Sequence, residues 1–343
     1  MKSNAIRVIV GVAILAGSVW AFVQWRHSTA VARIPSPPPA RAKSVTAHIA
    51  EKYEAARKAP ASPVAVGALC VAYHADMLFS QADRCYALAM ELDSSQWRWR
   101  YYRALIQAER GEDESLVEDL RLVLEQAPGF GPAWQRLGDA LFKARRYDEA
   151  REAWQRAATA PPSDANQPSP RHVTEVPLSA YANVGLARIA LVRGEMNKAQ
   201  KILELVAAET PQFSSAPRLL ADVYRTLGRK ADAERLVSRA NGLHPFAPYL
   251  DPMVDDLTRE SRNSSLLLRV SSEANLAVNA EWAEYLTRRA VEFDPDNAEA
   301  RTKLGVVLIQ QGRVAQAREQ LEAALRADPS LGPARQALES IGR

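Results

Sequence analysis

The feature that most constrains this chain is a unit of about 34 residues at positions 131–164, in which one amphipathic helix follows another. The first half places apolar and small residues on one helical face, at Trp134, Leu137, Gly138 and Leu141. The second half does the same and then ends on prolines, at Ala150, Trp154, Ala157, Pro161 and Pro162. Because the small residues let the two backbones approach closely, the unit predicts a pair of antiparallel helices.

The same pattern recurs along the chain with a period of about 34 residues. Clear copies lie at residues 63–96, 180–213, 214–247 and 298–331, and degenerate copies lie at 97–129 and 264–297. Abutting copies keep their register, which unrelated alanine-rich helices would not do. The sequence therefore predicts about seven helix pairs stacked side by side, each covering the apolar face of its neighbour.

These residues resemble the tetratricopeptide repeat (TPR), whose signature is W-x2-L-G-x2-Y, then A-x3-F, then a closing proline. Leu141 stands where that family usually has tyrosine, Trp154 where it has phenylalanine, and Arg145 where it has the turn glycine. The resemblance implies an all-α fold, a TPR superhelix (α-solenoid) of about seven helix-turn-helix repeats. It also implies that the first helices line a concave groove that holds a partner.

Proline-rich and polar stretches divide the chain into segments. We expect a signal anchor or transmembrane helix at 1–27, a Pro-rich linker and lead-in helix at 28–62, repeats 1–3 at 63–164, a spacer at 165–179, repeats 4–5 at 180–247, a spacer at 248–263, repeats 6–7 at 264–331 and a capping helix at 332–343. The second spacer is acidic and predicts a solvated loop in which Asp255 or Asp256 opens a short helix, rather than a cation site. The sequence leaves open whether either spacer folds onto the groove.

The N-terminus is apolar between two groups of basic residues. Residues 8–23 carry no charge, and residues 6–25, with Arg7 reaching outward, would form a helix about 30 Å long, enough to span a hydrocarbon core. The pattern favours an uncleaved signal anchor over a signal peptide cleaved near residues 30–32 and over inverted insertion. The bulk of the chain is then expected on the exported side of a membrane, the periplasmic side in a Gram-negative cell.

The sequence contains no motif of a catalytic or cofactor site. It lacks the phosphate-binding, dinucleotide-binding, zinc-protease and serine-hydrolase patterns, and it has no C-x-x-C-H for covalent haem. We therefore expect no enzyme activity, no cofactor and no metal. The 44 basic and 40 acidic residues are interleaved, so we expect no nucleic-acid partner. The aromatic and basic cluster at residues 97–103 keeps open an RNA or polysaccharide binder as a minor alternative.

The two cysteines, Cys70 and Cys85, fall on the two helices of the first repeat. Cys70 occupies a small-residue core position and Cys85 flanks one, which favours two separate buried thiols. In an oxidising compartment the pair would instead form a disulfide.

The expected functional surface is the groove on the first helices. Mapping that face onto the sequence selects these residues for partner binding: His74, Tyr101, Leu105, Gln135, Asp139, Phe142, Arg188, Leu191, Arg218, Asp222 and Arg225. Aromatic, apolar and arginine side chains of this kind anchor peptides. The leading interpretation is a non-catalytic, membrane-tethered TPR scaffold that binds a protein or peptide and assists assembly of a cell-envelope complex. The alternative is an accessory or substrate-platform subunit of an envelope enzyme system, for example cytochrome c maturation.

Overall fold

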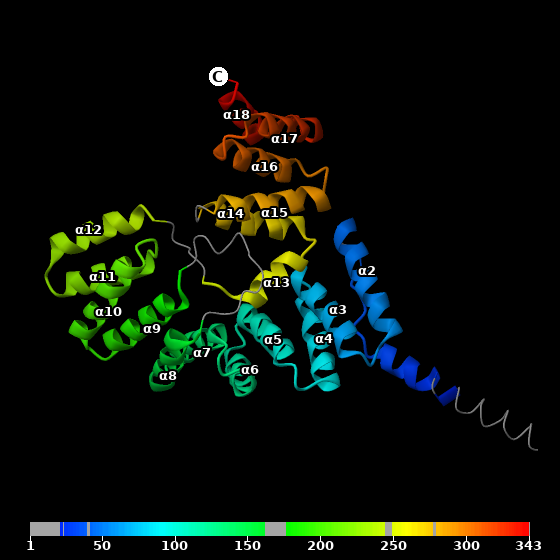
Figure 1. Ribbon diagram of the computed structural model, residues 1–343, viewed down its shortest axis with the longest axis horizontal. Coiled ribbons are helices and arrows are strands. Elements are labelled where there is room, and N and C mark those ends of the chain that lie inside the picture. Colours follow the sequence, from blue (N-terminus) through cyan, green and yellow to red (C-terminus); the bar gives the residue numbers. More distant parts are fainter. Residues whose placement is uncertain are drawn as a thin grey trace, which may run out of the picture.

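The fold is all-α over the residues that the computed structural model describes, which are 21–22, 24–39, 42–161, 176–243, 249–276 and 279–342 (Figure 1). Within these ranges every regular element is a helix, and most helices form hairpins with their neighbours in the chain. The all-α class expected from the repeat pattern is therefore confirmed.

The helices follow one another in pairs, with single helices at three places. The order is α2 (Lys43–Lys58), α3 (Pro63–Ala75), α4 (Phe79–Leu92), α5 (Trp97–Arg110), α6 (Asp113–Gln126), α7 (Gly131–Lys143), α8 (Tyr147–Thr159), α9 (Leu178–Val192), α10 (Met196–Glu209), α11 (Ser215–Thr226), α12 (Lys230–Asn241), α13 (Pro252–Glu260), α14 (Ser264–Leu276), α15 (Ala280–Phe293), α16 (Ala298–Gln310), α17 (Val314–Ala327) and α18 (Gly332–Ser340). The hairpins run from α3–α4 to α11–α12 and then from α14–α15 to α16–α17.

Glycines facing tryptophans hold neighbouring hairpins together. Trp154 on α8 is fully buried, and Gly138 on α7 and Gly185 on α9 both lie against its indole ring. A Cβ atom added at either glycine would overlap that ring. The same arrangement recurs where Gly67 on α3 faces Trp99 on α5. The small residues of the repeat pattern thus bring three successive helices into contact at one aromatic side chain.

The first helices of the pairs lie on the inside of the curve. Among helices two apart in the chain, the more extensive contacts are α3–α5, α7–α9, α14–α16 and α16–α18. In the first three of these contacts, the helix that opens one repeat meets the helix that opens the next, and in the fourth it meets the single helix α18 in the equivalent place. The first helices therefore form the concave side of the superhelix, as the repeat pattern implied.

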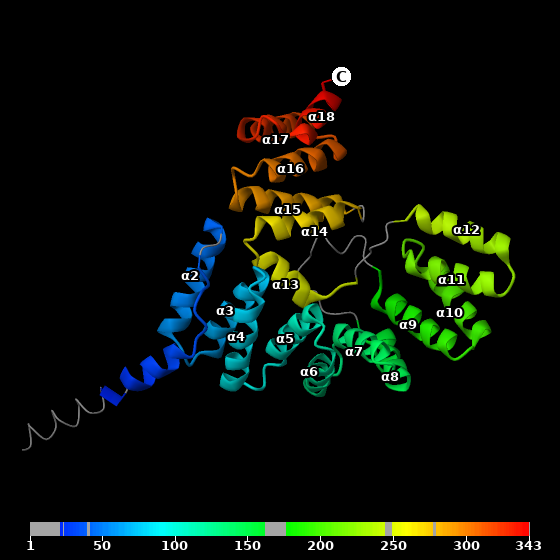
Figure 2. The ribbon, with the colours of Figure 1, turned by 180° about the vertical axis from the view of Figure 1, so that it is seen from behind.

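The superhelix consists of two stacks of hairpins joined by α13. The first stack runs from α3 to α12, and α13 then packs on α3 (Figures 1 and 2). The second stack, α14–α18, has apolar clusters of its own, around Leu286 and around Leu321. Met253 of α13 belongs instead to the core of the first repeats. Of the spacer expected at 248–263, the described residues 249–263 therefore form an ordered element between the two stacks.

The residues before the first repeat fold back onto it. Ile34 is buried, and the Tyr73 hydroxyl donates a hydrogen bond of 2.7 Å to the Pro35 carbonyl oxygen. Helix α2 packs along α3. The proline-rich stretch, expected to be an extended spacer, is thus held against the first repeat at these two positions.

Most of the predicted anchor at residues 1–27 lies outside the described residues, apart from positions 21–22 and 24–27. Of the helices that the structure does describe, none is both long enough and apolar enough to cross a bilayer. The membrane helix in the expected fold therefore has no support from the structure.

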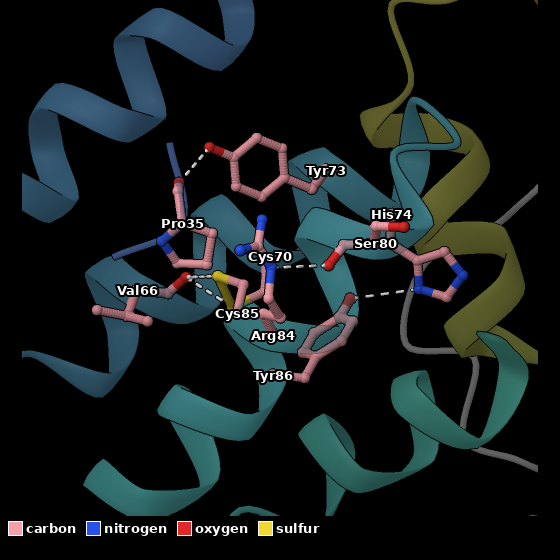
Figure 3. Close-up of a disulfide and its surroundings, with 9 residues drawn as sticks. All are labelled: Pro35, Val66, Cys70, Tyr73, His74, Ser80, Arg84, Cys85 and Tyr86. Carbon is pink, nitrogen blue, oxygen red and sulfur yellow. Dashed lines mark hydrogen bonds between the residues drawn. A yellow bond between two sulfur atoms is a disulfide. The ribbon is translucent and has the colours of Figure 1, made fainter. Parts of the chain in front are cut away.

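A disulfide joins Cys70 on α3 to Cys85 on α4 (Figure 3). Both side chains are fully buried, and the two Cα atoms are 5.2 Å apart, within the usual span of a disulfide. The expectation of two separate thiols is wrong. The expectation failed because the side chain of Cys85 faces α3 across the hairpin, and does not lie to the side of the surface where α3 and α4 meet.

Candidate functional site

The concave side of the first repeats holds a buried carboxylate, Asp251. Tyr101 on α5 donates its hydroxyl to Asp251 Oδ2 at 2.7 Å, and Arg136 on α7 donates to the same oxygen at 2.9 Å. Arg136 Nε also donates to the Tyr101 hydroxyl oxygen at 2.8 Å. Tyr101 is 0% and Asp251 2% exposed, and burial raises the pKa of Tyr101 well above its ordinary value, which keeps the hydroxyl protonated. This buried group of three fixes the start of α13 to α5 and α7.

Asp251 also opens α13. Its side chain accepts a hydrogen bond of 3.2 Å from the Met253 amide, and Pro252 occupies the first turn, where a missing N–H costs nothing. The residue that caps the start of α13 is thus Asp251, and the expectation that Asp255 or Asp256 opens the helix is wrong. Met253 is buried in the core of the first repeats. The apolar side of α13 therefore lies on the concave surface of the protein.

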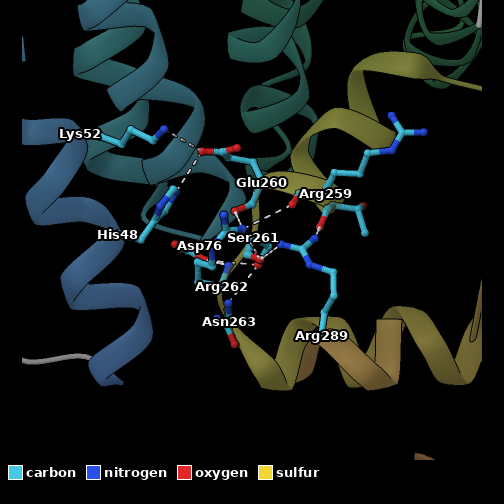
Figure 4. A network of polar contacts seen from close by, with 10 residues as sticks. His48, Lys52, Asp76, Arg259, Glu260, Ser261, Arg262, Asn263 and Arg289 are labelled. Atoms are coloured by element: carbon cyan, nitrogen blue, oxygen red, sulfur yellow. Dashed lines mark hydrogen bonds and ion pairs between the residues drawn. The ribbon is translucent and has the colours of Figure 1, made fainter. Parts of the chain in front are cut away.

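The other end of α13 is tied to both stacks by polar contacts (Figure 4). Asp76, at the turn after α3, accepts hydrogen bonds from the Ser261 hydroxyl at 3.1 Å and from the Arg262 amide at 2.8 Å. Arg289 on α15 donates to the Ser261 carbonyl oxygen at 3.1 Å. Burial raises the pKa of Asp76, although these hydrogen bonds act in the opposite direction. The residues that end α13 thus connect the first repeat to the second stack.

Helix α2 contributes to the same junction. His48 Nε2 lies 3.0 Å from Glu260 Oε1, and Lys52 Nζ lies 3.7 Å from the same oxygen. The close contact with His48 lowers the pKa of Glu260, and the charges of Lys52 and Arg262 add to this effect. Glu260 is therefore held in its ionised form between α2 and α13.

A cleft of about 510 Å³ adjoins α13. Its walls come from α3, α4, α5, α7, α13, α14 and α15, and most of its lining is apolar, including Phe79, Leu105, Leu257, Leu266, Val270 and Trp282. His74 also lines it and lies 3.4 Å from the Tyr86 hydroxyl through Nδ1. Burial lowers the pKa of His74 to about 3, so the imidazole is neutral. The cleft is suited to apolar side chains.

We call the concave side of α3, α5 and α7, which segment 249–263 covers, the occupied face. The concave residues of α7, α9 and α11 form what we call the exposed face. It consists of Asp139, Phe142, Arg188, Leu191, Arg218, Asp222 and Arg225, of which Phe142 and Leu191 are half-buried and the others exposed. The Arg188 guanidinium lies 4.2 Å from the centre of the Phe142 ring. Arg225 pairs with Asp222, and Arg218 donates to the Ala240 carbonyl oxygen at 3.3 Å.

The structure separates the predicted groove residues into two groups. Four of them are buried, namely His74, Tyr101, Leu105 and Gln135. The other predicted residues make up the exposed face. Partner binding by either group remains a prediction. Sequence reasoning missed Arg136 and Asp251, although the Asp251–Pro252 pair is a helix-start signal that could have located α13.

The aromatic and basic cluster at residues 97–103 supports the packing of α5. Trp99 lies against Gly67, and Tyr102 is buried. Arg100 donates to Asp119 at 2.7 Å. Tyr101 and Tyr102 are buried and Trp97 and Trp99 are half-buried, so only part of the stacking platform required by the alternative of RNA or polysaccharide binding is exposed.

The acidic residues of the second spacer make contacts with cations of the protein. Asp251 pairs with Arg136, Asp256 pairs with Arg259 at 3.2 Å, and Glu260 lies 3.7 Å from Lys52. Over the ranges whose placement is described, no group of three or more His, Cys, Asp or Glu residues is placed to hold a metal ion. Asp251 and Glu260 thus hold the two ends of α13 in place, whereas the pair of Asp256 and Arg259 lies within α13.

Comparison with protein families identifies the helix hairpins. Tetratricopeptide-repeat family models match residues 131–160 and residues 279–340, which correspond to α7–α8 and to α15–α18. The chain contains tetratricopeptide repeats. The TPR segments lie on both sides of α13, so each of the two stacks includes sequence of this family.

Known proteins share the repeat over limited lengths. The chain is 34% identical over 86 residues to the small glutamine-rich tetratricopeptide repeat-containing protein 2 of Mycosarcoma maydis, covering 25% of this chain and 24% of that protein. It is 28% identical over 193 residues to the human protein O-mannosyl-transferase TMTC1, covering 56% of this chain and 19% of that protein. The chain thus spans about a quarter or less of these curated relatives.

Solved TPR structures resemble the fold at low sequence identity. Yeast Tom70 matches with a TM-score of 0.43 and 15% identity, over 87% of this chain and 58% of that one. MamA matches with a TM-score of 0.40 and 20% identity, over 48% of this chain and 87% of that one.

Proposed function

We propose that this chain is a non-catalytic TPR scaffold that binds a protein or peptide partner on its exposed face. The observation that carries the proposal is the composition of that face. Arg188 is exposed over Phe142, and Arg218 and Arg225 are exposed on α11, on helices whose backbones are fixed by the repeat packing. Arginine and aromatic side chains on a rigid concave surface provide charged and apolar anchors for an extended or helical segment.

We further propose that the scaffold is tethered to a membrane by residues 6–25 and works on the exported side. Two features support this placement. The sequence of that segment is apolar and flanked by basic residues. The disulfide between Cys70 and Cys85 is of the kind that persists in oxidising compartments. Tethering would raise the local concentration of the bound partner, as suits a protein that assists assembly of a cell-envelope complex.

The test is a pull-down with residues 28–343 before and after charge reversal on the exposed face. We expect a triple change of Arg188, Arg218 and Arg225 to glutamate to lower recovery of partners by at least about tenfold. A matched triple reversal at Arg156, Lys201 and Arg326, which are exposed on the second helices α8, α10 and α17, should leave recovery unchanged. Unchanged recovery of every partner by the first variant would refute the assignment of this face.

A further inference from the structure

We propose that segment 249–263 is an exchangeable ligand built into the chain. In its place, the occupied face would take a partner helix that begins with a carboxylate. This surface is separate from the exposed face, so the proposal does not rest on the function assigned to that face. The contacts of the segment define the chemistry of the partner in two steps.

The first requirement is a carboxylate. Tyr101 and Arg136 both donate to Asp251 Oδ2, and the side chain of Arg136 is only 26% exposed. If the segment left without replacement, both donors would lose their acceptor in a buried position, which costs more than an ordinary hydrogen bond contributes. The segment therefore leaves in exchange for another aspartate or glutamate side chain rather than for an apolar peptide.

The second requirement is a short apolar helix face after that carboxylate. Helix α13 has 9 residues, whereas isolated helices shorter than about 12 residues are marginal in water. Its helical form therefore depends on the surface beneath it, as that of a bound peptide does. Met253 is buried there, and Val254 and Leu257 are half-buried against the same core. A replacing helix needs apolar residues at the equivalent positions.

The surroundings of α13 give such a helix room to enter. The cleft of about 510 Å³ runs beside α13, with Val254 and Leu257 on one wall and Phe79 and Leu105 on another. An incoming helix can thus contact apolar side chains before the segment has left. Because the segment is part of the same chain, its effective concentration is high, on the order of millimolar, and a free peptide competes poorly until one cis contact is removed.

The experiment uses a fluorescent peptide with the sequence of residues 249–263, YLDPMVDDLTRESRN, titrated into the full chain and followed by anisotropy. In the chain that carries Asp251→Ala the cis segment is weakened. We expect this chain to bind the peptide at least about tenfold more tightly than the wild-type chain does. A peptide that itself carries Asp251→Ala should bind the Asp251→Ala chain without this gain in affinity. The unchanged peptide should also show no gain with a chain that combines Asp251→Ala with Tyr101→Phe and Arg136→Met.

The matched control is Asp256→Ala, in the chain and in the peptide. Asp256 lies on the same helix but is exposed and pairs with Arg259, so its removal should change neither titration. The proposal fails if a folded Asp251→Ala chain does not bind the peptide, or if it binds both peptides equally. If Asp251→Ala prevents folding, hydrogen exchange of residues 252–260 is measured in the wild-type chain with saturating peptide. Exchange that is about tenfold faster supports replacement of the segment. Unchanged exchange shows that segment 249–263 stays bound to the occupied face, which overturns the proposal.

Discussion

The occupied face and the exposed face are built from the same kind of helix and differ in what covers them. On the occupied face, Tyr101 and Arg136 are satisfied by Asp251 of the same chain. On the exposed face, Arg188 lies over Phe142 and remains accessible to solvent. Polar residues on the inside of a TPR curve therefore have two roles in this protein. They either hold the two stacks together or remain available to a partner.

The largest expected difference between the two faces comes from removing Arg136. Arg136→Ala leaves the buried Asp251 carboxylate without its cation, so we expect the first repeats to lose about 3 to 5 kcal/mol of stability. Protection of the slowest amides of α5 and α7 against hydrogen exchange measures this loss. The variant Arg136→Met combined with Asp251→Leu, which removes both charges, should recover most of it. If Arg136→Ala lowers the stability of the first repeats only slightly, the polar contacts of the occupied face do not contribute more to folding than those of the exposed face.

The second difference is the disulfide, which lies under the occupied face only. Replacing Cys70 and Cys85 by alanine should lower the stability of the first repeats by about 3 kcal/mol, the entropy of a loop of this length. Exchange protection in α9–α12 should not change. Thiol titration of the unreduced, denatured chain should detect no free sulfhydryl. Two free thiols in protein isolated from an oxidising compartment would contradict the structure.

Acid should act on the occupied face before the exposed face. The folded pKa of His74 is about 3, below its ordinary value of 6.5, so the unfolded chain takes up a proton that the folded chain excludes. The contribution of neutral His74 to the stability of the folded chain is therefore complete above about pH 6.5. It declines as the pH falls, with about 2 kcal/mol lost near pH 5. Thermal melting between neutral and mildly acidic pH tests this. His74→Phe should flatten the profile of the first repeats, whereas residues 176–243 contain no histidine.

The smallest expected effect on stability is at Arg188. Arg188→Ala removes an exposed contact with the Phe142 ring, and we expect a change within about 0.5 kcal/mol. Thermal unfolding followed by circular dichroism measures it, with Arg156→Ala on α8 as the exposed control. A loss as large as that for Arg136→Ala would mean that the exposed face is also part of the folding core.

Much of the local structure followed from residue spacing. The small residue Gly138 was expected to let two helices approach closely, and the structure places it directly against the Trp154 ring. Such contacts join residues within one repeat or between adjacent repeats, where the period of small and large side chains carries the information. The same reasoning misjudged Cys85, because a one-position difference on a helix face decides whether two sulfur atoms meet.

The candidate site could be predicted only in part. Arg188 and Arg225 remain on an accessible concave surface as expected, whereas Tyr101 and His74 are buried. The pattern that selects first-helix positions is the same for all four residues. It cannot distinguish a position open to solvent from one beneath another segment of the chain.

The sequence alone determined that the described part of this chain is all-α and that its helices pair as TPR hairpins with a period of about 34 residues. These properties depend on interactions between residues close together in the chain. Only the tertiary structure decided that the repeats form two stacks and that α13 covers the concave side of the first. The contact responsible joins Tyr101 to Asp251, which are 150 positions apart. A buried hydrogen bond between such distant segments leaves no periodic trace in the sequence, because it depends on where the chain returns in space.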